Sequence, residues 1–186
     1  MPVQVPNWLL HRFKAVYHEP PHYESSYYGP INMLLTTYFP AVDGYLVKPQ
    51  ARLRQPPSPG ARTSIDSTGQ KVGTRSDDGN PDFLVSKGSP TLDADVPLLI
   101  YEVKRHDVGD AEAAHQIDRY IEWGMQYLSQ LGSPMGRMRA VLVIGSKSKL
   151  FMLEWGPQSQ AVHGVHDLDT TGEEILAILQ NIRDGQ

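Results

Sequence analysis

The chain of 186 residues contains no cysteine. This absence excludes disulfides, thiolate metal sites, iron–sulfur clusters and cysteine nucleophiles together. Long apolar runs are missing as well, since no stretch approaches the roughly 18 apolar residues that a membrane span needs. Near the N-terminus the longest apolar run is Trp8-Leu9-Leu10, which is too short for the core of a signal peptide. We therefore expect an intracellular protein, cytoplasmic or nuclear, with no secretion and no membrane contact.

Charge of one sign is not in large excess. The chain has 17 Lys and Arg against 21 Asp and Glu, which gives a formal net charge of −4. This balance lacks the overall basic footprint common in nucleic-acid-binding proteins, although local fields matter more than the sum. Hydrophobic residues make up 40% of the chain, as in ordinary globular domains. At this length we expect a single domain over residues 1–186.

Several common catalytic motifs are also absent from the sequence. It contains no G-x-S-x-G elbow, no P-loop, no G-x-G-x-x-G and no H-E-x-x-H. His18 and His22 have the four-residue spacing of a helical metal pair, but two prolines stand between them and prevent a continuous helix. We expect both to be solvated surface histidines. His163 and His166 have the same interpretation, in a predicted loop after the last strand.

Two helical patterns open the chain. The first spans residues 7–17 and the second spans residues 22–39, where Gly29-Pro30 predicts a kink or a restart. Glu24 precedes an inward-facing tyrosine by three residues, so it points along the same apolar stripe if the helix is continuous. The apolar side of the first pattern consists of Trp8, Leu9, Phe13 and Val16.

The remaining periodicity alternates between strands and helices. Residues 55–80 are the exception, because 11 of these 26 residues are Pro, Gly or Ser, which predicts a long flexible loop. The complete order of α, β, β, β, α, β, β, α favours an α/β (α+β) fold, with helices flanking one mixed central sheet. Strands are predicted over residues 44–54, 82–86, 97–104, 139–144 and 149–155, and further helices over 111–131 and 172–183.

Ionisable side chains interrupt the most apolar predicted strand, residues 97–104. Residues two apart on a strand share a face, so Glu102 and Lys104 project together, while Tyr101 and Val103 face the other way. Asp82 begins the preceding strand, and antiparallel pairing brings it beside Glu102. A buried ionised group is costly unless something compensates it, so this cluster is a candidate site. The alternative is a structural ion pair at a sheet edge.

The chemistry of this cluster suits phosphodiester hydrolysis. Asp82, Glu102 and the carbonyl of Val103 offer hard oxygen ligands for Mg²⁺ or Mn²⁺, and a divalent cation relieves the repulsion between two carboxylates. Lys104 beside the metal is able to orient or deprotonate an attacking water and to stabilise charge on a phosphate.

The pattern Pro81-Asp82…Glu102-Val103-Lys104 resembles the PD-(D/E)xK nuclease superfamily. The resemblance implies a restriction-endonuclease-like αβββαβ core, over about residues 22–155, and a metal-dependent nuclease, for which DNA is favoured over RNA as the substrate. It also implies an acid from the leading helix, for which Glu24 is the match and Glu19 the fallback. In the helix after the lysine strand, Gln116 and Tyr120 reproduce the Gln-x-x-x-Tyr pattern of the RecB-like branch and are expected to support the site.

A local excess of basic residues marks the expected contact with nucleic acid. Residues 44–75 hold six basic side chains and one acid, Asp66, which is a local charge of +5. Such a segment is suited to backbone phosphates, and solvated loop charge is the alternative. The basic side chains are Lys48, Arg52, Arg54, Arg62, Lys71 and Arg75, and Arg105, directly after Lys104, joins the expected contacts.

Three functions remain open at this point. The first is a divalent-metal-dependent nuclease, a phosphodiester hydrolase acting as endonuclease or exonuclease. The second is a catalytically inactive nuclease-fold module that binds nucleic acid or a protein partner. The third is a hydrolase of another phosphate ester. A nuclease with one site that cuts both strands often acts as a two-fold dimer, so a homodimer is one arrangement the sequence allows.

Overall fold

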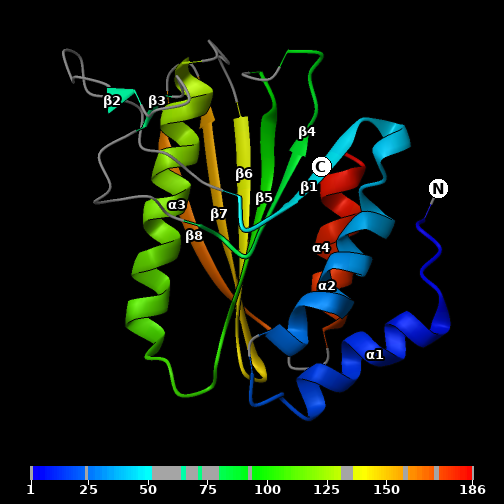
Figure 1. The fold of residues 1–186 in the computed structure, drawn as a ribbon. Coiled ribbons are helices and arrows are strands. Elements are labelled where there is room, and N and C mark those ends of the chain that lie inside the picture. Colours follow the sequence, from blue (N-terminus) through cyan, green and yellow to red (C-terminus); the bar gives the residue numbers. More distant parts are fainter. Residues whose placement is uncertain are drawn as a thin grey trace.

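A six-stranded mixed sheet forms the middle layer of the fold, with helices on both faces (Figure 1). This architecture confirms the predicted mixed α/β class with one central sheet. The strand order is β1-β4-β5-β6-β7-β8. The computed structural model describes residues 2–23, 25–51, 64–65, 71–72, 80–91, 94–130, 136–156, 159–169 and 172–185.

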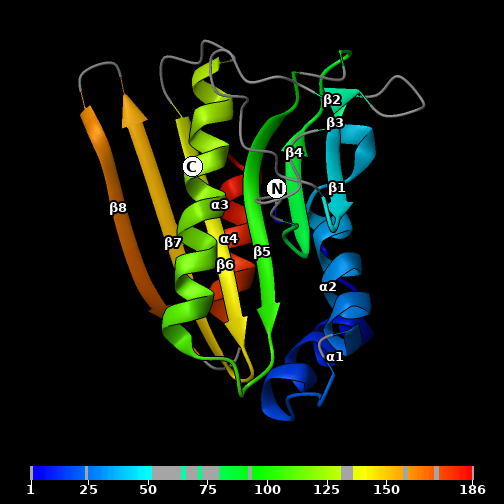
Figure 2. The same ribbon diagram turned by 60° about the vertical axis from the view of Figure 1, so that its left-hand side comes forward.

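The centre of the sheet is a parallel pair, β5 with β6, and the other neighbours in this sheet are antiparallel (Figure 2). A parallel pair needs a long crossover, and the helix α3 (Asp110–Gln130) supplies it. The six strands are β1 (Tyr45–Pro49), β4 (Phe83–Lys87), β5 (Val96–Lys104), β6 (Gly136–Ile144), β7 (Lys147–Gly156) and β8 (Ser159–Leu168).

One prediction about a loop was wrong. The segment with His163 and His166 is not a loop but part of β8, which pairs antiparallel with β7. Pairing with β7 gives regular backbone structure to a segment with weak apolar alternation. Most of the predicted loop over residues 55–80 lies outside the described residues, and its described part includes a short antiparallel pair, β2 (Ser64–Ile65) with β3 (Lys71–Val72).

Three helices cover one face of the sheet and α3 covers the other (Figures 1 and 2). A 3₁₀ turn, η1 (Ala41–Asp43), leads into β1. None of the described helices is both long and apolar enough to cross a membrane. The three helices are α1 (Asn7–His18), α2 (Ser25–Tyr38) and α4 (Glu173–Arg183).

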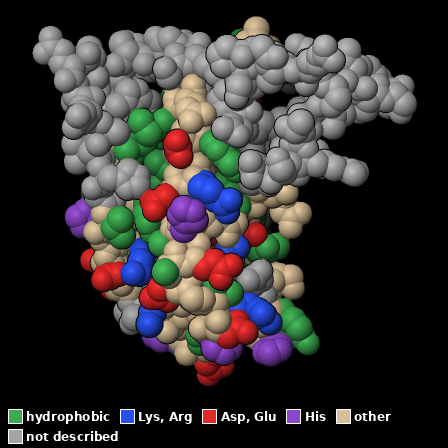
Figure 3. Space-filling view, turned by 90° about the vertical axis from the view of Figure 1, so that its left-hand side faces the viewer, with side chains coloured by type: hydrophobic (Ala, Val, Ile, Leu, Met, Phe, Trp, Pro, Cys, Tyr) green, Lys and Arg blue, Asp and Glu red, His purple; other side chains and the backbone are tan. Residues whose placement is uncertain are grey.

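The outer side of α3 mixes both signs of charge. Figure 3 shows acidic, basic and histidine side chains interspersed over the described part of this face, without a continuous basic band there. The exposed ionisable residues of α3 are Asp110, Glu112, His115, Asp118, Arg119 and Glu122.

The predicted restart of the helix at Gly29-Pro30 does not occur. α2 runs without interruption from Ser25 to Tyr38 with Pro30 inside it. Proline removes one backbone hydrogen bond, but burial of a whole apolar stripe outweighs that loss, because packing contributes most of the stability of a helix. The buried residues of this stripe are Tyr27, Ile31, Leu34, Leu35 and Tyr38.

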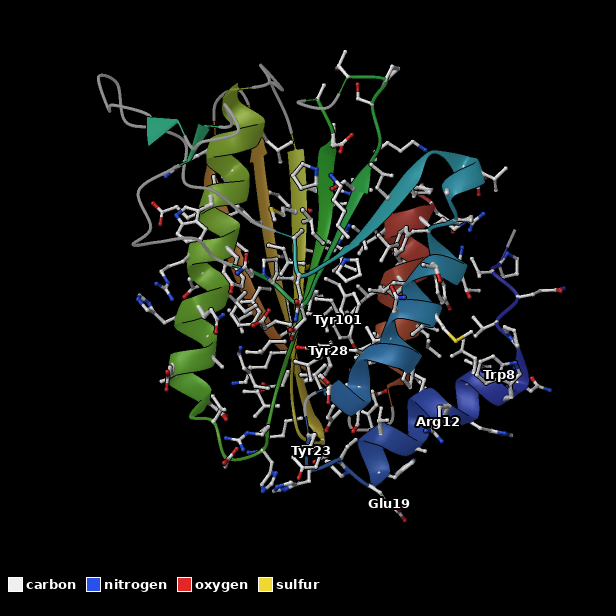
Figure 4. All side chains as sticks on the ribbon, viewed as in Figure 1. Trp8, Arg12, Glu19, Tyr23, Tyr28 and Tyr101 are labelled. Atoms are coloured by element: carbon white, nitrogen blue, oxygen red, sulfur yellow. The ribbon has the colours of Figure 1, made fainter. Side chains whose placement is uncertain are left out.

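Trp8 also differs from its prediction. Its side chain is 56% exposed and lies on the outer side of α1 (Figure 4), whereas the other three members of the predicted apolar side are buried. Leu9, Phe13 and Val16 follow the spacings of four and three that define a helical stripe, and Trp8 lies one residue away from it.

The two faces of β5 enter two separate cores. Tyr101 and Val103 pack with α1, α2 and α4, while Ile100 packs with α3. This alternation is the one predicted from the sequence. α3 also lies close to β6: a Cβ atom on Gly124 would stand 2.3 Å from Sδ of Met138. The side chains of Glu102 and Lys104 therefore lie between the sheet and a helix that is held tightly against it.

Candidate active site

Two buried acids lie side by side where β4 begins. Asp82 directly precedes β4, and the register that pairs Phe83 with Tyr101 sets Asp82 next to Glu102. The backbone N–H of Asp82 donates to Oε2 of Glu102 at 3.0 Å, and the N–H of Val103 donates to Oδ2 of Asp82 at 2.8 Å. Asp82 is 8% exposed and Glu102 is 1% exposed. The structure thus brings the two predicted acids together.

Lys104 and two side chains of α3 complete the surroundings of Glu102. The Nζ atom of Lys104 lies 2.6 Å from Oε1 of Glu102. The amide nitrogen of Gln116 donates to the same oxygen at 3.2 Å and also donates to the hydroxyl of Tyr120. Residues four apart share a face of a helix, so Gln116 and Tyr120 reach the site together. Every one of these residues was named from the sequence.

The electrostatics of the cluster are those of a crowded anionic site. Burial, and next the charge of Asp82, raise the pKa of Glu102 to about 7, although Lys104 acts in the opposite direction. Burial and the charge of Glu102 raise the pKa of Tyr120 as well, so that hydroxyl stays protonated at neutral pH. Glu102 is therefore poised between its charged and neutral forms, and a nearby cation favours the charged form.

Tyr28 is a site residue that the sequence interpretation missed. Its hydroxyl donates to Oδ1 of Asp82 at 2.5 Å, and its ring stands edge-on to Phe83 with centroids 5.6 Å apart. Figure 4 shows Tyr28 directed from α2 toward the middle of the sheet. The available signal in the sequence is weak: Tyr28 follows the inward Tyr27, one position away from the apolar stripe of the helix.

The other predicted site residues stand apart from this cluster or lie outside the described residues. Glu19 is exposed just after α1 and points away from the sheet (Figure 4). Arg105 is exposed and pairs with Asp107 at 3.3 Å. For Lys71 the structure describes the backbone in β3 and not the side chain. The positions outside the described residues are Glu24, Arg52, Arg54, Arg62 and Arg75.

The cluster has the donor chemistry of a site for a hard cation. Asp82, Glu102 and the carbonyl of Val103 are oxygen donors, the type that Mg²⁺ and Mn²⁺ prefer. Burial is the main cause of the raised pKa of Glu102 and repulsion by Asp82 adds to it, and a divalent cation relieves that repulsion. Among the side chains that the structure describes, no three or more His, Asp or Glu groups are placed to hold a metal together. By their donor type, Asp82 and Glu102 offer two carboxylates to such a cation.

No protein-family model, no curated protein and no solved structure matches this chain. The functional argument therefore depends on the residues and on their geometry.

Proposed function

We propose that the protein is a Mg²⁺- or Mn²⁺-dependent nuclease that hydrolyses phosphodiester bonds in DNA, on a restriction-endonuclease-like core. The observation that carries this proposal is the cluster in which the buried acids Asp82 and Glu102 lie side by side and the partly buried Lys104 contacts Glu102. The element order supports it, because α2, β1, β4, β5, α3 and β6 follow one another as αβββαβ once the short pair β2 and β3 is set aside.

Asp82 and Glu102 would hold the metal, with the carbonyl of Val103 beside them and Glu24 as a further acid. When bound, the divalent cation lowers the pKa of a coordinated water and neutralises charge on the phosphate. Lys104 lies on the same face, so its ammonium is placed to orient the attacking water and to stabilise negative charge that develops on phosphate oxygens. The attacking water gives up one proton as its oxygen bonds to phosphorus, the bond from phosphorus to the leaving oxygen breaks, and that oxygen takes up a proton.

Three other side chains position this group rather than react. Gln116 holds the carboxylate of Glu102, and Tyr120 accepts a hydrogen bond from Gln116. On the other side, Tyr28 holds the carboxylate of Asp82. Positioning residues of this kind limit the directions in which the two acids present their oxygens.

A second candidate is a nuclease-fold module that binds nucleic acid or a protein partner without cutting. The short contact between Lys104 and Glu102 favours it, because the lysine already compensates one of the two acids without a metal. Binding of Mn²⁺ separates the two candidates, since a docking module has no need of the metal.

The test is cleavage of supercoiled plasmid, single-stranded DNA and single-stranded RNA with Mg²⁺, Mn²⁺ or EDTA, comparing the wild type with Lys104→Ala. We expect metal-dependent cutting of DNA that falls by at least about 100-fold in the variant, the range typical for loss of one proton-transfer or charge-stabilising group. Lys149→Ala is the matched control, because Lys149 lies on β7 and faces Asp167 at 3.6 Å. Cutting that persists in Lys104→Ala removes the role of Lys104, and a folded wild type that cuts none of the substrates favours the docking module.

A further inference from the structure

A pocket of about 320 Å³ opens at the carboxyl ends of the parallel pair β5 and β6. In sheets with parallel strands, ligands commonly bind outside the carboxyl ends of those strands. The pocket is lined by the linker between α1 and α2, the connection into α3 and the turn between β6 and β7. Its lining residues are Pro20, His106, Asp110, Ile144, Ser146 and Lys147.

The pocket adjoins the candidate active site through Lys104. Ile144, which lines the pocket, is the register partner of Lys104 across β5 and β6. The N–H of Gly145 donates to the carbonyl of Lys104 at 3.2 Å, and a Cβ atom on Gly145 would stand 2.9 Å from Cβ of His106. A ligand in the pocket would therefore lie next to Lys104 and the candidate active site.

The lining has the mixed chemistry that a nucleotide requires. Lys147 and His106 supply a cation and a ring N–H for a phosphate, and Ser146 supplies a hydroxyl. Pro20 and Ile144 offer apolar surface for a base or a sugar, and the pocket volume is within the usual range for small-molecule sites. Asp110 repels a bare phosphate but accepts hydrogen bonds from an exocyclic amine or a sugar hydroxyl, so a whole nucleotide fits this lining better than inorganic phosphate.

We infer that this pocket binds one nucleotide unit, and in the proposed nuclease that unit is the nucleotide next to the cleaved bond. The inference rests on the proposed function for the identity of the substrate. Tyr23 lies three residues after Pro20 in the same linker and is 68% exposed. The ring of His22 stands edge-on to the ring of Tyr23, with ring centroids 4.8 Å apart. Exposed aromatic rings are the usual stacking surfaces for single-stranded bases. A strand that is unpaired beside the cut would leave a base free to stack on Tyr23.

The first test is binding of a labelled single-stranded DNA oligonucleotide in EDTA, where a metal-dependent enzyme cuts nothing. We expect Lys147→Gln and His106→Ala each to weaken binding about 3- to 10-fold. Lys147→Gln should also reduce the slope of log affinity against log salt by about 0.7, the value for one phosphate contact on a single strand. Lys149→Gln makes the same change of charge two residues further along β7, outside the pocket lining, and should leave both quantities unchanged.

The second test is an NMR titration with a free deoxynucleoside monophosphate, followed at the backbone amides of His106, Ser146 and Lys147. Amide shifts with the mononucleotide show that the pocket also accepts free nucleotides, and shifts with the oligonucleotide alone show that the unit must be part of a strand. Unchanged binding in both pocket variants, together with no amide shifts, overturns the inference.

Plasmid cleavage by the same variants is measured in parallel. If the variants bind oligonucleotide as the wild type does and also cut at the wild-type rate, the protein is a nuclease without this subsite. If the pocket binds nucleotide but the protein cuts no substrate, the pocket is supported and the proposed nuclease function is wrong.

Discussion

The two faces of β5 bury polar groups in opposite ways. Toward α1 and α2, the hydroxyl of Tyr101 lies 2.8 Å from the hydroxyl of Tyr17, and burial raises the pKa of both tyrosines, so the pair stays neutral. Toward α3, Glu102 lies beside a second acid, and its pKa is raised only to about 7. On one face, β5 therefore presents a neutral tyrosine that is hydrogen-bonded to a second tyrosine, and on the other face it presents an acid with a pKa of about 7.

The two faces of β5 are therefore expected to have different roles, one in stability and the other in activity. A buried pair that is neutral and joined by a hydrogen bond needs no ligand, and it adds specificity to the packing. Two neighbouring carboxylates raise the free energy of the folded protein unless a proton or a cation compensates them. We therefore expect changes on the tyrosine face to alter stability without altering activity, and changes on the acidic face to alter activity and pH dependence.

The largest effect is expected for Glu102→Gln. The substitution keeps the shape of the side chain but removes one of the two charged metal donors. We expect affinity for Mn²⁺, measured by isothermal titration calorimetry, and the cleavage rate to fall by at least about 100-fold. The matched control is Tyr101→Phe, one position away on the other face, which should retain both. Equal loss in the two variants would mean that the faces are not functionally distinct.

The pH dependence of stability should follow Glu102 in the metal-free protein. Its pKa in the folded state is about 7, above its ordinary value of 4.5, so the folded state holds the proton more tightly than the unfolded state does. The contribution of Glu102 is therefore greatest below about pH 4.5 and is lost as the pH rises toward 7. We expect the difference in unfolding free energy between wild type and Glu102→Gln to change by roughly 2 to 3 kcal/mol between pH 4.5 and pH 8.

Urea denaturation in EDTA across this pH range provides the measurement. The comparison with Glu102→Gln cancels contributions from the distant titrating groups that the two proteins share. Saturating Mg²⁺ should reverse the loss at pH 8, because a ligand that binds the folded state stabilises it. A flat difference across the range would show that Lys104 alone compensates Glu102.

Tyr101→Phe tests the neutral face by itself. The variant leaves the buried hydroxyl of Tyr17 without its partner at 2.8 Å. We expect a loss of about 1 to 3 kcal/mol in unfolding free energy, measured by chemical denaturation. The affinity for Mn²⁺ should be unchanged. The double variant with Tyr17→Phe should recover part of the loss, since both hydroxyls are then absent.

The smallest effect is expected for Tyr28→Phe. The ring and its contact with Phe83 remain, but Asp82 loses one hydrogen bond. We expect a decrease of about 3- to 10-fold in Mn²⁺ affinity, corresponding to roughly 1 kcal/mol, because the hydroxyl only positions Asp82 and does not itself bind the metal. The variant should change unfolding free energy little in EDTA. An unchanged Mn²⁺ affinity would mean that Val103 positions Asp82 without help from Tyr28.

The parts of the site that follow from local periodicity could be predicted from the sequence. Alternation along a strand places Glu102 and Lys104 on one face, and helical spacing places Gln116 and Tyr120 together. Tyr28 could not be found in this way, because its contact with Asp82 depends on how α2 crosses the sheet. The way α2 crosses the sheet is determined by the packing of the whole helix, so no short sequence motif indicates the contact.

The fold also has parts that the sequence predicts and parts that it does not. The mixed sheet and its flanking helices could be predicted from strong apolar patterns, whereas β8 could not. Its sequence, SQAVHGVHDL, has few large apolar residues, and Val165 is 53% exposed. This strand exists because β7 offers a complete edge of backbone donors and acceptors. Pairing between segments, rather than the composition of one segment, decides such elements.

The separations along the chain within the site imply an order of assembly. The contact between Asp82 and Glu102 joins residues 20 apart, whereas the contact between Tyr28 and Asp82 joins residues 54 apart. The entropy lost on closing a loop increases with its length, so the shorter loop closes at lower cost. We expect the two acids to meet early in folding, as β4 pairs with β5, and Tyr28 to dock afterwards. The contact between Asp82 and Glu102 would then form before α1 and α2 pack against the sheet.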